Sequence, residues 1–244
     1  MRSRILLAVA VAVGCSLAGT NAALALPSLQ LGAGSGNWTY DTGTGTWVTA
    51  DNPLQLLATA NATKEDGGKG AYAWSEKGTL QYAYLVVAAV PKTNSSDALD
   101  ITVQNDGGSL ALYTSGYGAP PVSDPNSLAD HGIFDSYFEI YEFNFDGALT
   151  TISNTQPPGG GSGAGFTELF NIAINSLGTG VNAIHFDLFT VAGSGRLNGT
   201  SLVSAFAPFS HDAQAIPEPG AVAVFAIGNL VAGALIRRFT ARKD

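Results

Sequence analysis

LQYAYLVVAAV, residues 80–90, is the stretch that decides the fold. In a strand, successive side chains point to opposite faces. Here the alternation makes both faces apolar, with Tyr82, Tyr84 and Val86 on one and Ala83, Leu85 and Val87 on the other. Burial on both faces is typical of a strand inside a covered sheet. We therefore predict a central strand with a pairing partner on each side.

Short apolar or alternating runs separated by turn residues occupy most of residues 26–213, and no helix longer than two turns is expected there. The expected strands are residues 38–40 and 46–48 around a turn at 41–45, then 54–61, 80–90, 97–103, 110–113, 136–145, 148–152, 170–174 and 183–191. Asn105-Asp106-Gly107-Gly108 should turn the chain so that 110–113 pairs back on 97–103. Residues 148–152 should continue the 136–145 strand after a turn at Asp146-Gly147. Residues 116–126 and 157–165 are expected loops.

About ten strands with no long helix predict an all-β domain. The economical arrangement is an antiparallel two-sheet sandwich of jelly-roll type. We assign it to residues 26–213.

The first 25 residues have the features of a secretory signal peptide. Arg2 and Arg4 precede an apolar stretch at 5–13, and Ala23-Leu24-Ala25 provides a small-x-small cleavage site. Cys15 offers an alternative as a lipoprotein cysteine, but Ala12 is a poor match three positions before it. Cleavage after Ala25 leaves an exported part without cysteine, which excludes disulfides and thiol chemistry there.

The net charge of the exported part argues against a nucleic-acid-binding protein. Residues 26–219 contain five basic and eighteen acidic side chains, a formal charge of −13. Such a surface repels nucleic acid, so no nucleic-acid partner is expected.

The last stretch, residues 214–244, has three parts. Pro217-Glu218-Pro219 forces an extended, exposed spacer, because proline fixes φ and lacks an amide hydrogen. Residues 220–236 are apolar except for Asn229 and reach the lower length limit of a membrane-spanning helix. The basic tail at 237–244 begins with Arg237 and Arg238, which would stay on the cytoplasmic side.

This tail resembles the PEP-CTERM sorting signal of bacterial surface proteins. Pro217, Glu218 and Pro219 match its motif, and Arg237 and Arg238 match its arginine cluster. The resemblance implies a precursor tethered in the inner membrane, cut by the membrane-embedded transpeptidase exosortase, and then located at the cell surface or in the extracellular matrix. An ordinary C-terminal membrane anchor is the alternative.

Three further blocks, residues 131–138, 185–189 and 206–213, resemble those of a choice-of-anchor family, of the N type. Such proteins are extracellular and β-rich and end in different anchors. The resemblance implies a structural or adhesive role in the polysaccharide matrix and no established activity.

Candidate chemistry is sparse, and we predict no enzyme. Ser210-His211-Asp212 names the members of a hydrolase triad, but adjacent residues of an extended segment point apart, and the chain has no Gly-x-Ser-x-Gly elbow. A metal or ligand site could arise if histidines and aspartates converge. The candidates are His131, Asp135, His185, Asp187, His211 and Asp212. The alternative is that these histidines and aspartates only make structural hydrogen bonds, at turns or within a strand.

No cofactor is expected, although loop oxygens could hold a structural calcium ion. Those oxygens belong to Asp97, Asp100, Asp106, Asp124 and Asn126. The alternative function is a carbohydrate-binding module, whose stacking surface would come from Trp38, Tyr40, Trp47, Tyr72, Trp74, Tyr113 and Tyr117. The alternative is that these aromatic rings pack inside the sandwich or in cross-strand pairs.

Overall fold

A computed structural model describes residues 26–62, 82–121, 135–145, 148–157, 159–191, 196–198, 203–207 and 213–217. The expected signal peptide, with Ala23 and Ala25, lies outside these residues, as do the apolar run at 220–236 and the basic tail. Within the described ranges, no helix is long and apolar enough to span a membrane.

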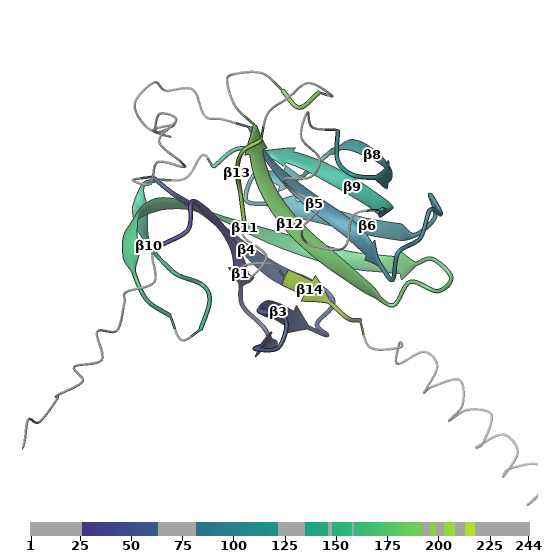
Figure 1. The fold of residues 1–244 in the computed structure, drawn as a ribbon, viewed down its shortest axis with the longest axis horizontal. Coiled ribbons are helices and arrows are strands. Elements are labelled where there is room, and N and C mark those ends of the chain that lie inside the picture. Colours follow the sequence, from purple (N-terminus) through teal and green to yellow (C-terminus); the bar gives the residue numbers. More distant parts are fainter. Residues whose placement is uncertain are drawn as a thin grey trace, which may run out of the picture.

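Fourteen strands make up the described fold, in two sheets (Figure 1). The six-stranded sheet has the order β1-β4-β11-β6-β7, with β10 paired to β11. Its strands are β1 (Leu29–Ala33), β4 (Leu54–Asn61), β6 (Leu99–Asn105), β7 (Gly108–Ser109), β10 (Thr150–Ser153) and β11 (Ser162–Leu177). The eight-stranded sheet has the order β2-β3-β14-β12-β5-β9-β8, with β13 paired to β12. Its strands are β2 (Trp38–Asp41), β3 (Thr46–Thr49), β5 (Ala83–Val90), β8 (Leu112–Gly118), β9 (Ser136–Phe143), β12 (Ala183–Val191), β13 (Val203–Phe206) and β14 (Ala213–Ala215).

β5 is central, as its sequence predicts. It pairs with β12 on one side and β9 on the other. Its inner face meets the other sheet in a large apolar cluster, represented by Leu56, Leu85, Phe170 and Phe186. We call this the inner cluster. The all-β, two-sheet prediction is therefore confirmed.

The outer face of β5 is buried as well. Tyr84, Val86, Ile140 and Phe189 belong to a second apolar cluster on the side of the eight-stranded sheet that faces away from the other sheet. We call this the outer cluster. Both apolar faces of residues 80–90 thus have a physical explanation.

The antiparallel prediction needs one correction, because β14 pairs with β3 in parallel. Every other pairing described is antiparallel. The parallel pair arises because β14 returns from the end of the chain and inserts between β3 and β12.

The loop predicted at 157–165 is wrong at its end, because β11 already begins at Ser162. A Cβ atom on Gly165 would lie 2.4 Å from both the Ala60 carbonyl oxygen and Ile152 Cδ1. The glycine lets three strands approach closely at this point, as glycine inside a strand often does. A glycine-rich composition was therefore misleading about backbone conformation.

Three other strand predictions also need correction. The turn at residues 105–108 is present, but the strand that returns on β6 is only β7. Leu110 also pairs back, since its amide donates to the Val103 carbonyl oxygen at 2.9 Å, but Leu112 and Tyr113 enter β8. β8 pairs with β9 in the other sheet and extends into the expected loop at 116–126. Residues 150–153 form β10, which pairs with β11 and does not continue β9. These errors concern partners, which depend on long-range contacts.

Candidate functional site

The sorting motif begins where the described fold ends. Ala213 and Ala215 of β14 are fully buried, and the Ile216 amide donates to the Thr49 carbonyl oxygen at 2.8 Å. Pro217 is partly exposed and has no amide hydrogen with which to continue the ladder. Glu218, Pro219, Arg237 and Arg238 lie outside the described residues. Pro217 therefore marks the exit of the chain from the sheet.

Two hollows flank this exit. The larger, of about 630 Å³, is lined by residues that include Asn52, Asn175, Asn182, Gln214, Ile216 and Pro217. The smaller, of about 450 Å³, lies over β2 and β3, where its lining includes Asn37, Thr39 and Val48 beside Ile216 and Pro217. No charged side chain is among the described residues that line either hollow.

Two of the predicted His and Asp candidates come together. His185 and Asp187 share one face of β12, with Nε2 and Oδ2 3.6 Å apart, and each side chain is 3% exposed. Asp135 has an exposed side chain and a φ of 86°, which places it in a turn conformation. His131, His211 and Asp212 lie outside the described residues. Among the described side chains, no group of three or more His, Cys, Asp or Glu could hold a metal ion.

The residues that bracket positions 208–212 are described. The Ala207 amide donates to the Leu188 carbonyl oxygen at 2.8 Å, and Ala213 pairs with Phe186. These two anchors lie on either side of Asp187 along β12. The His185–Asp187 pair is thus near the chain positions that flank Ser210-His211-Asp212, although the conformation of that segment lies outside the described residues.

Of the aromatic side chains proposed for sugar stacking, those that pack against other residues are Trp38, Tyr40, Trp47 and Tyr113. Trp38 and Trp47 are partly buried against the inner cluster. Trp47 Nε1 donates to the Thr155 carbonyl oxygen at 2.9 Å, and Tyr40 meets the Trp47 ring edge to face, with centroids 5.2 Å apart. The hydrogen bond to Thr155 fastens the β2–β3 hairpin to the segment after β10. Tyr117 is 59% exposed, and Tyr72 and Trp74 lie outside the described residues.

The aspartates proposed for calcium are engaged in local hydrogen bonds where those are described. The Asp100 carboxylate accepts from Asn175 Nδ2 at 3.1 Å and from the Ser176 hydroxyl at 3.5 Å. The Asp97 carboxylate accepts from the Ser96 hydroxyl at 3.5 Å, and the Asp97 amide donates to the Ser95 hydroxyl at 3.3 Å. Asp106 occupies the turn between β6 and β7. Asp124 and Asn126 lie outside the described residues.

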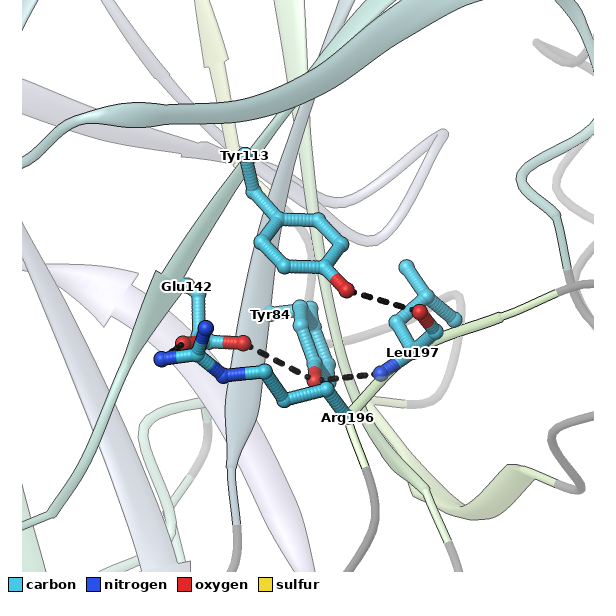
Figure 2. A network of polar contacts seen from close by, with 5 residues as sticks. All are labelled: Tyr84, Tyr113, Glu142, Arg196 and Leu197. Atoms are coloured by element: carbon cyan, nitrogen blue, oxygen red, sulfur yellow. Dashed lines mark hydrogen bonds and ion pairs between the residues drawn. The ribbon is translucent and has the colours of Figure 1, made fainter.

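A polar network that the sequence did not predict covers one end of the outer cluster (Figure 2). The buried Tyr84 hydroxyl accepts from the Leu197 amide at 2.8 Å and donates to Glu142 Oε2 at 3.2 Å. Tyr113 Oη donates to the Leu197 carbonyl oxygen at 2.7 Å, and Arg196 Nη2 lies 3.2 Å from Glu142 Oε1. Residues from β5, β8 and β9 thereby hold the segment that follows β12. Burial raises the pKa of the Tyr84 hydroxyl, so it stays protonated as a donor.

A carboxyl group also lies in the inner cluster. Glu139 is 8% exposed and shares the inner face of β9 with Tyr137 and Tyr141. Tyr141 Oη donates to Glu139 Oε2 at 2.7 Å, and Tyr137 Oη donates to Oε1 at 3.5 Å. Burial raises the pKa of Glu139, and the hydrogen bonds from the two tyrosines oppose this only in part. The sequence could have indicated this site, because Glu139 alternates with Tyr137 and Tyr141 and so lies on the same face of the strand as these aromatic residues.

Ionisation of the buried Glu139 should lower the free energy of unfolding at neutral pH, and the Glu139→Gln substitution should remove this effect. The folded state binds the Glu139 proton more tightly than the unfolded state does. The free energy of unfolding therefore falls as the pH rises from the unfolded value of about 4.5 through the raised folded pKa. Glutamine resembles the neutral carboxyl and has no such step. Urea unfolding at several pH values should show the wild type losing stability relative to Glu139→Gln as the pH rises, and a constant difference would contradict the assignment.

Comparison with known proteins adds little. No family model matches the chain, and no curated protein matches it either. Among solved structures, the chain aligns with AvmM, which is described as catalysing macrocyclization in alchivemycin A biosynthesis. The identity is 7%, the alignment covers 77% of this chain and 98% of AvmM, and the TM-score is 0.35. A similarity of this size carries no argument about function.

Proposed function

We propose that this chain is an exported protein of the bacterial envelope or extracellular matrix, with a structural or adhesive role and no enzymatic activity. Its precursor is tethered by residues 220–236 and is cut at Pro217-Glu218-Pro219 by exosortase. The membrane, exosortase and the surrounding polysaccharide are its partners. Membership of the choice-of-anchor family is also a prediction from the sequence.

One observation carries the proposal. The last described strand, β14, ends at Ala215, and the last backbone hydrogen bond described before the motif is made by the Ile216 amide. A cut beyond the motif would therefore remove none of the described strands. The fold and the sorting signal are separate along the chain, as a removable signal requires.

The buried polar groups support a structural role. The hydroxyl of Tyr84 and the carboxyl of Glu139 are held by tyrosines, a backbone amide or a neighbouring carboxylate inside apolar clusters. Buried groups that are satisfied in this way stabilise a single packing arrangement. The acidic exported part would keep such a protein soluble outside the cell.

Carbohydrate binding is the alternative function. It has less support, because the Trp38 and Trp47 rings pack against the inner cluster and do not form an open platform. Tyr117 on β8, which belongs to the proposed set, is exposed and within reach of a sugar.

The intact mass of the protein from cells with and without exosortase tests the proposal. With exosortase, we expect a mass that lacks residues 220–244; without it, the mass should include them. A Pro217→Ala, Pro219→Ala double variant keeps the apolar run and the arginines and should remain uncut. A mass that includes residues 220–244 in both strains would identify a plain membrane anchor.

A further inference from the structure

The tether between the folded body and the membrane is short. The hydrogen bond to Thr49 fixes Ile216 to the sheet, and the apolar run begins at Gly220. Four residues reach at most about 14 Å, however they are arranged. The headgroup layer of one leaflet takes about 5 to 8 Å of this distance. Less than about 10 Å is left between the folded body and the bilayer surface.

That gap excludes a peptidase lying beneath the body. A single α-helix with its side chains is about 10 to 12 Å wide. An enzyme that cuts within the tether must therefore contact the end of the sandwich from which Pro217 emerges.

Release of β14 would lengthen the tether, but the structure opposes it. β14 is an interior strand, paired with β12 on one side and β3 on the other. Its Ala213 and Ala215 side chains belong to the inner cluster. Peeling it away would also detach the β2–β3 hairpin from the rest of the sheet. The folded end is thus the surface that the enzyme meets.

The surface at this end combines uncharged lining residues with two carboxylates at its border. Both hollows beside Pro217 are lined by amide, hydroxyl and apolar side chains, and none of their described lining residues is charged. The Asp51 carboxylate accepts from the Asn37 amide at 2.6 Å, and the Asp100 carboxylate accepts from Asn175 Nδ2 at 3.1 Å. Residues that line the hollows therefore hold the neighbouring carboxylates by hydrogen bonds.

We propose that the surface formed by the two hollows around Ile216 and Pro217 is a docking surface for the membrane-embedded peptidase. This inference rests on the proposed function and adds a second element to recognition. The folded domain is read together with the Pro-Glu-Pro motif, because the tether is too short to present the motif alone.

The test compares two arginine substitutions at exposed positions. Asn182→Arg would project into the larger hollow, and the Asn182 backbone contact to Val90 is unaffected by its side chain. Thr151→Arg adds the same charge on β10, which pairs with the opposite end of β11 (Figure 1). Each full-length chain is produced with exosortase, and the cut fraction is followed over time by intact mass. We expect Asn182→Arg to be cut roughly five-fold or more slowly than Thr151→Arg, the effect of losing one important interface contact.

A longer tether shows whether Asn182→Arg is cut slowly because it weakens docking or because it disturbs folding. Twelve Gly and Ser residues inserted between Ile216 and Pro217 add an average reach of about 19 Å. With this spacer, the two arginine variants should be cut at the same rate. If Asn182→Arg stays slow with the spacer, it acts through folding and the docking surface is wrong.

Other outcomes have distinct meanings. Equal rates for the two variants with the native tether overturn the docking surface while leaving the proposed function intact. Faster cutting when Ala215→Gly weakens β14 shows that the strand peels away, which also overturns it. A wild-type chain that exosortase does not cut overturns the proposed function, and this inference with it.

Discussion

Ending the exported chain after Pro219 should leave its stability unchanged, whereas ending it after Asp212 should lower the free energy of unfolding by at least about 4 kcal/mol. The second cut removes β14, which contributes ladder hydrogen bonds to two strands at about 1 kcal/mol each, in addition to two buried alanine side chains. A loss of this size is a large part of the 5 to 15 kcal/mol typical of a domain. The reference in both comparisons is the exported chain from residue 26 to 244 in detergent.

The effect should be concentrated at one edge of the eight-stranded sheet. Without β14, β3 loses its partner toward β12, and the β2–β3 hairpin is held mainly by contacts such as that of Trp47 with Thr155. Urea unfolding followed by tryptophan fluorescence measures the loss. A chain ending at Asp212 with the same unfolding midpoint as one ending at Pro219 would show that the hairpin does not depend on β14. The proposed docking surface would then be wrong, because β14 would be free to lengthen the tether.

The position of β14 was beyond the reach of sequence patterns. Ala213-Gln214-Ala215 is too short to show alternation and contains no β-branched or aromatic residue. Its place in the sheet comes from the unpaired edges of β3 and β12, which lie far away in the chain. The same reason explains why the partner of β8 was mispredicted. Pairing partners are properties of the whole fold, and local patterns carry little information about them.

Long strands buried on both faces were predictable because their composition reports their environment directly. β5 is a continuous apolar run, β12 is apolar except for His185, Asp187 and Thr190, and both lie inside the sheet. The candidate site was predictable only in part. His185 and Asp187 lie close together because positions i and i+2 of a strand share a face. The Tyr84 network joins three strands to the segment after β12, so no local spacing could have indicated it.

Replacing Tyr84 should be the most damaging single change in the outer cluster. Tyr84→Ala should lower the free energy of unfolding by about 3 to 5 kcal/mol, as expected when a buried aromatic ring leaves a cavity. The ring is fully buried and stacks on Phe189, with centroids 5.3 Å apart. Tyr117→Ala is the matched control, because that side chain is 59% exposed, and its effect should be below about 1 kcal/mol.

Tyr84→Phe separates the hydroxyl from the ring. The substitution keeps the stacking on Phe189 but leaves the Leu197 amide without the acceptor it has at 2.8 Å. A buried donor that loses its partner costs about 1 to 3 kcal/mol. Tyr113→Phe removes the bond to the carbonyl oxygen of the same residue, so the two substitutions should be non-additive in a double-mutant cycle. If both are neutral and additive, residues 196–198 are not held by this network, and packing alone covers this end of the outer cluster.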